Sequence, residues 1–330
     1  MRAAVIREFG PIEAVAAQEV PDPVLVAGQV LVEVYAAPVN YVDLLVVGGQ
    51  YQFLPALPFV PGKGPAGVVA AVGPNVSSLA IGDRVLAMVE QGGYAEKVAA
   101  AADQCYRLPA AMSFTEAASM SLAYDTSWFA LRERARIQAG ETVLVLGASG
   151  AVGLASVQLA KAMGARVLGG VSRPQRAGQV LKAGADAIVD LSGENLRDSL
   201  RERVKLANFG RYADVVIDPL GGDIFDAAVR ALAWCGRLVV VGFAAGRIPT
   251  LKMNYVMLKN IEISGLQVSD YRKRRPAQVA ACYAELFEFY EQGRIRPPEA
   301  TCYPLARAAE ALAAVRDRSA TGRSILSVRE

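Results

Sequence analysis

Histidine is absent from this 330-residue sequence, and its absence removes several classes of protein at once. Hydrolases that pair serine or cysteine with a histidine base are excluded, as are metal sites built on imidazole ligands. Cysteine is scarce: the four residues lie far apart and form no Cys-x-x-Cys pair, so we expect no structural zinc site. Scattered thiols of this kind are typical of a reducing cytoplasm. The four are Cys105, Cys235, Cys282 and Cys302.

Long apolar runs are also missing. No stretch approaches the ~18 uninterrupted apolar residues of a membrane span, and the first ten residues, MRAAVIREFG, lack the apolar centre of a signal peptide. The chain has 35 basic and 32 acidic residues, and the resulting net charge of +3 is too small to predict a nucleic-acid partner. Hydrophobic residues make up 53% of the chain, which excludes intrinsic disorder. We therefore expect a cytoplasmic globular protein, with no membrane partner and about two domains.

The first third of the chain predicts short strands. Runs rich in β-branched residues occupy 3–6, 29–39, 66–73 and 83–89, and proline, glycine and aspartate separate them. A helix is predicted to begin at Ser113, because Glu116 follows three residues later and the pair forms a capping box. Its apolar and small residues continue towards Gly140.

From Gly140 onwards strands and helices alternate. The strands are uniformly apolar, which predicts a parallel, doubly wound sheet of the α/β class. After it, the pattern predicts helices over 276–292 and 305–317 and a closing strand over 324–330. The alternating strands are predicted over 141–147, 165–171, 185–191, 213–222, 235–243 and 260–265, with helices over 154–164, 174–184 and 225–234.

A glycine-rich turn joins the first of these strands to the first helix. One glycine would allow the tight turn, one would let the backbone approach a pyrophosphate, and one would let the helix pack closely on the strand. The N-terminus of the helix would then present free N–H groups to the phosphates. We therefore predict dinucleotide binding by Gly147, Ala148, Ser149, Gly150, Ala151, Val152 and Gly153.

The end of the second strand indicates which dinucleotide is bound. Enzymes that use NAD place an acidic residue there for the ribose 2′-hydroxyl, but residues 169–176 contain no acid. Instead the segment offers Ser172, Arg173 and Arg176, and guanidinium groups form strong paired hydrogen bonds with phosphate. NADPH is therefore the predicted cofactor, although these arginines could simply be solvated at the start of a helix.

A series of short motifs, in their order and spacing, covers essentially the whole chain. Together they resemble the zinc-independent quinone oxidoreductases, the zeta-crystallin-like branch of the medium-chain dehydrogenase/reductase superfamily. The motifs are Pro38-Val39-Asn40-Tyr41-Val42-Asp43, Gly48-Gly49-Gln50-Tyr51, Pro61-Gly62, Ala66-Gly67-Val68-Val69, Gly82-Asp83-Arg84-Val85, Gly93-Tyr94-Ala95-Glu96, Thr126 ahead of Ala130-Leu131, and Gly140-Glu141-Thr142-Val143-Leu144-Val145.

The resemblance implies a GroES-like catalytic domain built from both ends of the chain around a Rossmann domain. The expected boundaries are 1–120 and 263–330 for the catalytic domain and 121–262 for the NADPH-binding domain. The resemblance also implies that Asn40 and Thr126 lie near the nicotinamide, in a cleft between the domains, and that Arg323 reaches the cofactor. A homodimer, formed through the last Rossmann strand, is a further expectation of the family.

The sequence departs from the family pattern at several positions. Gly64 stands where an acidic residue is frequent, and Leu45 replaces a common tyrosine in the substrate pocket. The cysteine, histidine and glutamate ligands of zinc-containing relatives are absent from the matching regions, so no catalytic metal is expected.

Without metal or histidine, catalysis would depend on the cofactor's hydride and on positioning. Tyr51 is the first candidate for a proton donor or an oxyanion partner, the alternative being a simple wall residue. Tyr41 would line the pocket. Asn40 needs hydrogen-bond partners in its apolar run, and either the cofactor or a capped turn could supply them. Gly242 and Phe243 follow the fifth strand, at the edge where a Rossmann sheet receives its ligand.

The basic run 272–275 has two interpretations: a solvated helix start, or a dock for a phosphorylated substrate such as an acyl-CoA thioester. The predicted function is NADPH-dependent reduction of a quinone or an activated α,β-unsaturated carbonyl. The alternatives are an enoyl- or acrylyl-CoA-type reductase of carbon–carbon double bonds and a non-enzymatic, crystallin-like NADPH-binding protein. The sequence alone leaves the physiological acceptor, the proton donor and the number of electrons passed at a time open.

Overall fold

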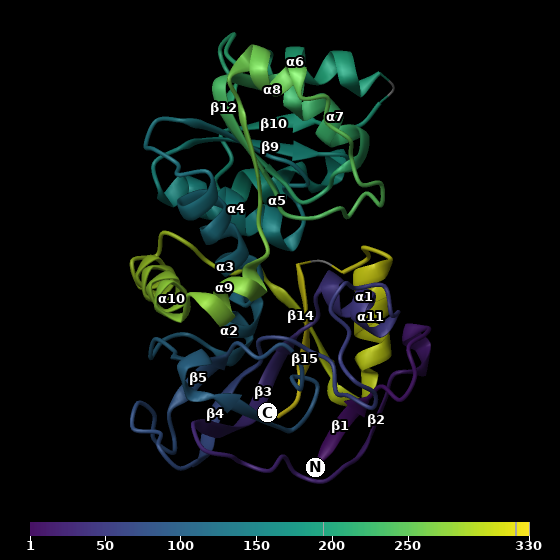
Figure 1. Cartoon of the computed structure of the whole chain (residues 1–330), viewed down its shortest axis with the longest axis vertical. Coiled ribbons are helices and arrows are strands. Elements are labelled where there is room, and N and C mark those ends of the chain that lie inside the picture. The colour runs from purple at the N-terminus through teal and green to yellow at the C-terminus, as the bar shows by residue number, and fades with distance from the viewer. Residues whose placement is uncertain (194, 321, 330) are drawn as a thin grey trace. The chain divides into compact units, whose positions relative to one another are not determined.

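The computed structural model describes residues 1–193, 195–320 and 322–329, and the chain divides into two compact units (Figure 1). The split unit comprises Met1–Leu122, Arg272–Tyr283 and Pro297–Glu330. The central unit comprises Ala123–Tyr271 and Ala284–Arg296.

The central unit contains a six-stranded sheet in which every neighbouring pair of strands is parallel. The spatial order is β10-β9-β8-β11-β12-β13. In order of appearance along the chain the strands therefore run third, second, first, fourth, fifth and sixth, the order of a Rossmann dinucleotide fold. The strands are β8 (Thr142–Val145), β9 (Arg166–Val171), β10 (Ala187–Asp190), β11 (Ala213–Asp218), β12 (Leu232–Val240) and β13 (Glu262–Gly265).

Helices follow the strands of this sheet, as the alternating pattern predicts, and the doubly wound α/β class is confirmed. The strands can be apolar throughout because the helices pack against the sheet; all four residues of β8 are buried. The helices are α3 (Ala123–Trp128), α4 (Ala151–Ala162), α5 (Ala177–Lys182), α6 (Leu196–Ala207), α7 (Gly222–Ala231) and α8 (Asn254–Lys259).

Two elements of the central unit differ from the sequence-based expectation. Helix α6 was not predicted, because its charged residues hide a short apolar face on which Leu200 and Val204 are buried four residues apart. The helix predicted over 225–234 is too long: α7 ends at Ala231, and Leu232 is already extended and paired with Ala213. Trp234 therefore belongs to β12, where its side chain is exposed.

The helix predicted from Ser113 begins as expected. The Ser113 hydroxyl accepts a hydrogen bond from the Glu116 amide at 3.2 Å, and the Glu116 carboxylate accepts one from the Ser113 amide at 2.9 Å. However, α2 (Phe114–Met120) stops after seven residues, because Ser121 is extended and Leu122 has a positive φ of 63°. Helix α3 then begins, and a π-helical segment, Phe129–Arg134, follows it.

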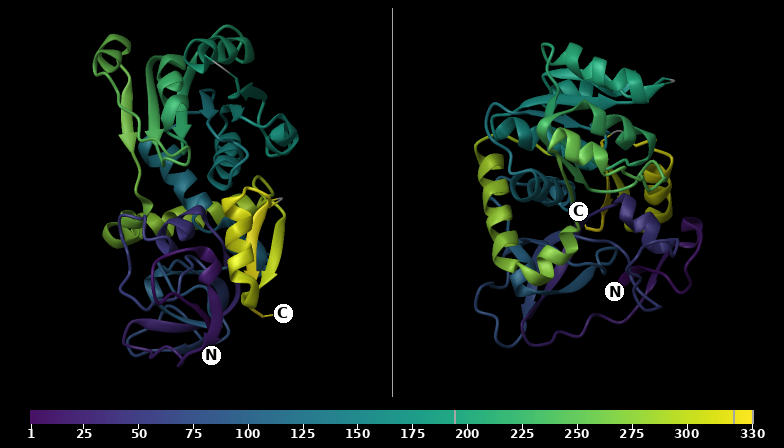
Figure 2. Two further views of the ribbon diagram at one scale, coloured as in Figure 1. Left: turned by 90° about the vertical axis from the view of Figure 1, so that its right-hand side faces the viewer. Right: turned by 45° about the horizontal axis from the view of Figure 1, so that its top comes forward.

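The split unit is built on a seven-stranded sheet to which both ends of the chain contribute. Its path is β14-β15-β3-β4-β5-β7, and β6 pairs with β3. Strand β15 runs antiparallel to β3, with Ile325 opposite Pro38. Figure 2 shows the yellow C-terminal strands beside the purple and blue N-terminal strands of this unit. The strands are β3 (Gln29–Pro38), β4 (Ala66–Val72), β5 (Arg84–Ala87), β6 (Lys97–Ala101), β7 (Cys105–Arg107), β14 (Ala300–Pro304) and β15 (Arg323–Ser327).

A two-stranded sheet and further helices complete the chain. Strands β1 (Arg2–Val5) and β2 (Ala16–Glu19) pair antiparallel with each other. Helices α1 (Tyr41–Val47) and α11 (Ala308–Arg316) belong to the split unit, and the closing strand predicted over 324–330 is observed as β15. Helices α9 (Val268–Arg274) and α10 (Pro276–Glu291) each include residues of both units. Within the described residues, no helix is long and apolar enough to cross a membrane.

Candidate active site

The glycine turn between β8 and α4 has the conformation that its sequence predicts. Gly147 has a positive φ of 59°, and Gly150 is the last extended residue before α4. A Cβ atom on Gly153 would lie 2.2 Å from the carbonyl oxygen of Gly147. The turn and the helix therefore approach each other so closely that only glycine fits at residue 153.

The N-terminus of α4 can receive an anion. The amides of Ala151, Val152 and Gly153 lie in its first turn, where they have no acceptor within the helix, and no side chain caps this end. Ser127 supports the turn from α3, since its hydroxyl lies 3.0 Å from the Val152 carbonyl oxygen. The hydroxyl of Ser156 in turn donates to that of Ser127. This combination suits the pyrophosphate of a dinucleotide.

The residues after β9 give the turn a basic neighbour. Ser172 and Arg173 are exposed and Arg176 is half-buried. Arg173 makes no ion pair with any residue that the structure describes, and residues 169–176 contain no carboxylate. Because the carboxyl ends of parallel strands meet at one edge of the sheet, these residues share that edge with the glycine turn.

Asp218, at the end of β11, is a site residue that sequence reasoning missed. Its side chain is fully buried, and one carboxylate oxygen accepts hydrogen bonds from the amides of Leu220, at 2.8 Å, and Gly221, at 3.0 Å. Burial raises the pKa of Asp218, against the effect of these two hydrogen bonds. A Cβ on Gly221 would approach the Phe243 ring to 2.9 Å, so Asp218 holds a loop that packs beside Gly242 and Phe243. An aspartate followed by Pro-Leu-Gly-Gly at a strand end was the available signal.

In the split unit, a buried polar cluster surrounds Asn40, the residue that precedes α1. Its side-chain oxygen accepts a hydrogen bond from the Arg323 guanidinium at 2.8 Å, and both residues are less than a tenth exposed. Its backbone amide donates to the Asp43 carboxylate at 2.8 Å. The Tyr94 hydroxyl donates to the same carboxylate oxygen at 3.0 Å. The structure thus places Arg323 directly against Asn40, two residues that the sequence assigned separately to the cofactor.

The Asp43 carboxylate is unusual for its burial. Removal from water raises its pKa to about 6, although the Asn40 amide, Lys63 and the Tyr94 hydroxyl all favour the charged form. Burial, together with the Asp43 charge, raises the pKa of Tyr94 well above its ordinary value. Tyr94 therefore remains a neutral hydrogen-bond donor to Asp43.

The predicted proton donor, Tyr51, is half-buried and lies near two other groups. Its ring centroid is 6.3 Å from that of Phe53, in an edge-to-face arrangement, and 5.9 Å from the Lys63 ammonium. Of the predicted pocket residues, Tyr41 is 46% exposed and Leu45 is half-buried.

Lys63, a buried residue that sequence reasoning overlooked, forms an ion pair with Glu90. The Arg272 guanidinium binds the other oxygen of the same carboxylate at 2.9 Å. The interpretation of residues 272–275 as a solvated helix start is therefore wrong for Arg272, which is 4% exposed because Glu90 neutralises it. The three residues that follow Arg272 are exposed.

The predicted residues are distributed over both units. Thr126, in α3 of the central unit, is 7% exposed, and its amide donates to the Asp125 carboxylate at 2.7 Å. The central unit also holds the glycine turn and the residues that follow β9 and β12. The split unit holds Asn40, Tyr41, Leu45, Tyr51 and Arg323.

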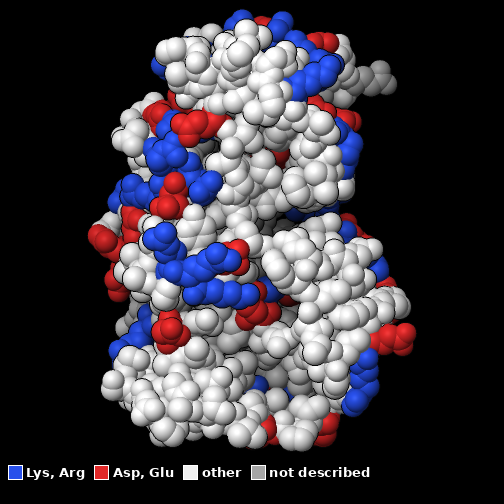
Figure 3. Space-filling view, viewed as in Figure 1, with Lys and Arg blue, Asp and Glu red and all other residues white. Residues whose placement is uncertain are grey.

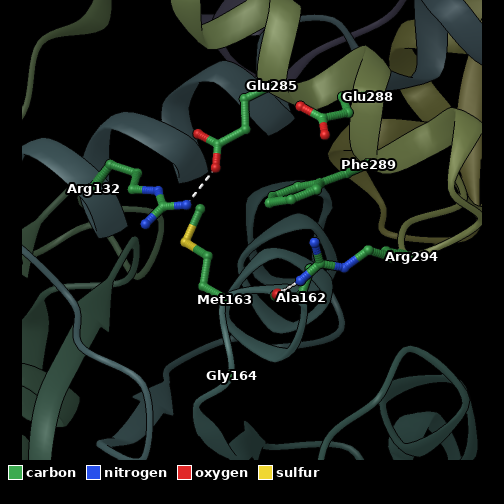
Figure 4. A pocket seen from close by; sticks show the side chains of 8 residues that line it. All are labelled: Arg132, Ala162, Met163, Gly164, Glu285, Glu288, Phe289 and Arg294. Carbon is green, nitrogen blue, oxygen red and sulfur yellow. Dashed lines mark hydrogen bonds and ion pairs between the residues drawn. The ribbon is translucent and has the colours of Figure 1, made fainter.

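The described residues also show a surface pocket on the central unit (Figure 4), lined by none of the predicted site residues. An Arg132–Glu285 ion pair borders it, and Arg294 stacks over the Phe289 ring while donating to the Ala162 carbonyl. In residues 1–193, 195–320 and 322–329, no group of three or more histidine, cysteine, aspartate or glutamate residues could hold a metal ion.

A Rossmann sheet combined with a β-rich unit built from both chain ends defines the medium-chain dehydrogenase/reductase class. In agreement, residues 26–110 match the family model of the alcohol dehydrogenase GroES-like domain, and residues 151–285 match that of the zinc-binding dehydrogenases. The second model's name refers to zinc, but this chain has no histidine, and its described residues offer no donor set for such an ion.

Curated relatives specify the family. The chain is 35% identical to quinone oxidoreductase-like protein 2 homolog of Nematostella vectensis, over 92% of this chain and 82% of the relative. It is 37% identical to mouse quinone oxidoreductase, over 94% of this chain and 92% of the relative. The chain therefore belongs to the quinone oxidoreductase family of medium-chain dehydrogenases/reductases.

Solved structures agree with this assignment. Quinone oxidoreductase of Pseudomonas syringae superposes with a TM-score of 0.91 at 27% identity, over 99% of both chains. Escherichia coli quinone oxidoreductase, solved in complex with NADPH, superposes with a TM-score of 0.90 at 29% identity, over 99% of this chain and 100% of that chain.

Proposed function

We propose that this protein is an NADPH-dependent oxidoreductase that reduces a quinone or an activated α,β-unsaturated carbonyl without a metal ion. The observation that carries the cofactor assignment is the end of β9, where exposed Arg173 has no ion-pair partner among the described residues and no carboxylate stands in residues 169–176. An acidic residue there would repel a 2′-phosphate, whereas a guanidinium binds it. The NADPH complex of the Escherichia coli relative supports the same choice.

The described residues of the central unit suit the parts of this cofactor. Ser172, Arg173 and Arg176 would hold the 2′-phosphate. The amides of the first turn of α4, with the glycine turn Gly147–Gly153, would hold the pyrophosphate. Thr126, Gly242 and Phe243 would face the nicotinamide half. The Thr126 hydroxyl makes no hydrogen bond to any described residue, so it can donate to a ligand.

NADPH supplies the hydride when it is bound, and the split unit would position the reacting groups. Asn40, held by Arg323, would bind the nicotinamide ribose or carboxamide with its remaining hydrogen-bonding capacity. Tyr41 and Leu45 would line the acceptor pocket. Tyr51 would donate a proton to the reduced oxygen. A quinone accepts hydride without a Lewis acid, so this chemistry needs no metal.

The cofactor assignment is tested by the ratio of kcat/KM for NADPH to that for NADH, with 1,4-benzoquinone as acceptor. We expect the wild type to prefer NADPH and Arg173→Ala to lower the ratio about tenfold, as for loss of a charge-assisted hydrogen bond. Arg211→Ala is the matched control, since exposed Arg211 precedes β11 at the opposite edge of the same sheet. Equal ratios in all three proteins would refute the assignment.

Two other functions remain as alternatives to be tested. A reductase of carbon–carbon double bonds would convert an enone to the saturated ketone, and product analysis distinguishes this from reduction of the carbonyl. A crystallin-like protein would bind NADPH tightly without turnover of any quinone. Tyr51→Phe tests the proton donor: unchanged turnover would remove Tyr51 from the mechanism.

We also propose that two copies of the chain associate through β13 and that the protein works in the cytoplasm. Strand β13 ends the six-stranded sheet and pairs with β12 alone among the described strands. All four cysteines are free thiols, as in cytoplasmic proteins.

A further inference from the structure

An exposed aromatic surface in the split unit lies between two lysine ammonium groups. Phe53 is 57% exposed, and Leu54 and Leu57 beside it are also exposed. The Lys273 ammonium lies 5.8 Å from the Phe53 ring centroid, and the Lys63 ammonium lies 5.9 Å from that of Tyr51. Because the two rings contact each other edge to face, one apolar surface has a cation at each end.

The inner end of this surface, beside Tyr51, holds a buried group of charged side chains. Lys63 and Arg272 are both buried, and both bind the carboxylate of Glu90, whose side chain is 36% exposed. Two cations thus share one carboxylate. Asp43 also faces Lys63 electrostatically; burial raises the pKa of Asp43 to about 6, so at pH 7 it is mostly ionised and adds a second negative charge to this end. Selection for an anion would therefore depend on the other end of the surface.

The outer end of this surface, beside Phe53, carries a positive charge that no described carboxylate neutralises. Lys273 is exposed near the end of α9 and makes no ion pair with any residue of 1–193, 195–320 or 322–329. Figure 3 shows a band of blue Lys and Arg atoms over this part of the molecule. Arg274, the next residue, is equally exposed and unpaired within the same residues, but it contacts no aromatic ring there.

We infer that the acceptor of this enzyme carries an anionic group, such as a carboxylate or a sulfonate, on a flat conjugated ring. The ring would pack on Tyr51, Phe53 and Leu54, and the anionic group would bind the Lys273 ammonium. An apolar surface alone would bind any hydrophobic quinone, whereas an unpaired cation at its border selects for negative charge. This inference rests on the proposed function, because it assigns a substrate class to the same reaction.

The test compares a neutral and an anionic acceptor, 1,4-naphthoquinone and 1,4-naphthoquinone-2-sulfonate, in NADPH oxidation by the 330-residue protein. Intrinsic reactivity differs between the two quinones, so the quantity measured is the change, from wild type to variant, in the ratio of their kcat/KM values. We expect Lys273→Glu to lower the ratio of anionic to neutral acceptor about fivefold, as for reversal of one exposed charge close to the ligand. Arg274→Glu, with the same charge change on the same helix, should alter it less than about twofold.

The outcomes separate this inference from the proposed function. A ratio unchanged in Lys273→Glu, or lowered equally in Arg274→Glu, overturns the inference while quinone reduction stands. If the wild type reduces neither quinone, the proposed function fails, and equilibrium dialysis with 2-naphthalenesulfonate tests the anion site. Weaker binding to Lys273→Glu than to Arg274→Glu would then support the site, and equal binding would overturn it.

Discussion

Asp43 is buried, and among the described residues it is held by hydrogen bonds and forms no ion pair within 4 Å. The Asn40 amide and the Tyr94 hydroxyl both donate to it, yet burial dominates and raises its pKa to about 6. Its unfolded pKa is about 3.9. The folded protein therefore holds a proton that the unfolded chain releases, and this group's contribution to stability is complete below about pH 4. As the pH rises to about 6, that contribution is lost.

We predict that ionisation of Asp43 costs about 3 kcal/mol of folding free energy at neutral pH, from a shift of roughly two pKa units. Asp43→Asn keeps an oxygen acceptor for both donors and cannot ionise. Urea unfolding across pH 4 to 7 should therefore show a smaller fall in stability for this variant than for the wild type. Parallel stability profiles for the two proteins would show that Asp43 is not the group responsible.

At the scale of single residues, the sequence identified side chains by type and motif but not by burial. Asn40 was selected because an amide in an apolar run needs partners, and the structure supplies Arg323 as one of them. Lys63 was missed because nothing local in the sequence distinguishes a buried charge from a solvated one, whereas for Asp218 the available signal, Pro-Leu-Gly-Gly after an aspartate at a strand end, was not used. The partner of Lys63, Glu90, lies 27 residues away along the chain. Asp218 binds the backbone loop that follows it, so its role depends on β11 ending at this residue.

At the scale of elements, the glycine turn packs directly against the first turn of α4. We predict that Gly153→Ala lowers NADPH affinity at least about tenfold and destabilises the protein by about 2 kcal/mol, because its Cβ would lie 2.2 Å from a backbone oxygen. Gly178→Ala, in α5 of the same unit, is the control. Nothing lies within 4 Å of the added Cβ there, so that variant should be slightly stabilised.

Fluorescence titration with NADPH and urea unfolding measure both effects. If Gly153→Ala bound NADPH as tightly as Gly178→Ala does, the close approach of turn and helix would not matter for the cofactor.

Elements were predictable where the local pattern decided them. Uniformly apolar strands and glycine turns gave the parallel sheet, and the Ser113–Glu116 pair marked a helix start correctly. The predicted ends of helices were wrong where contacts between residues distant in the sequence determine them. Trp234 has a helix-like context but follows Leu232, which pairs with Ala213 in the sheet. The break after α2 depends on a positive φ at Leu122, a conformation that is uncommon for leucine and that the sequence does not predict.

At the scale of the whole molecule, the six-stranded sheet ends in two unlike edges, β10 and β13. We predict a homodimer through β13, so light scattering should give twice the chain mass. Amides of Glu262–Gly265 should become more protected from hydrogen exchange as the protein concentration rises. The amides of β10 (Ala187–Asp190) are the internal control and should not change. A monomeric mass, or equal behaviour of both edges, would contradict the prediction.

The pairing of β15 with β3 has a consequence for how the protein is made. Arg323 is translated 283 residues after Asn40, with the entire central unit between them. The central unit can close its own sheet while the ribosome is still working, because most of its strands follow one another directly. The hydrogen bond between Arg323 and Asn40 can form only after residue 323 has been synthesised. A nascent chain can therefore acquire its Rossmann fold before the Asn40 side chain gains its Arg323 partner, and a chain that ends before residue 323 lacks that partner.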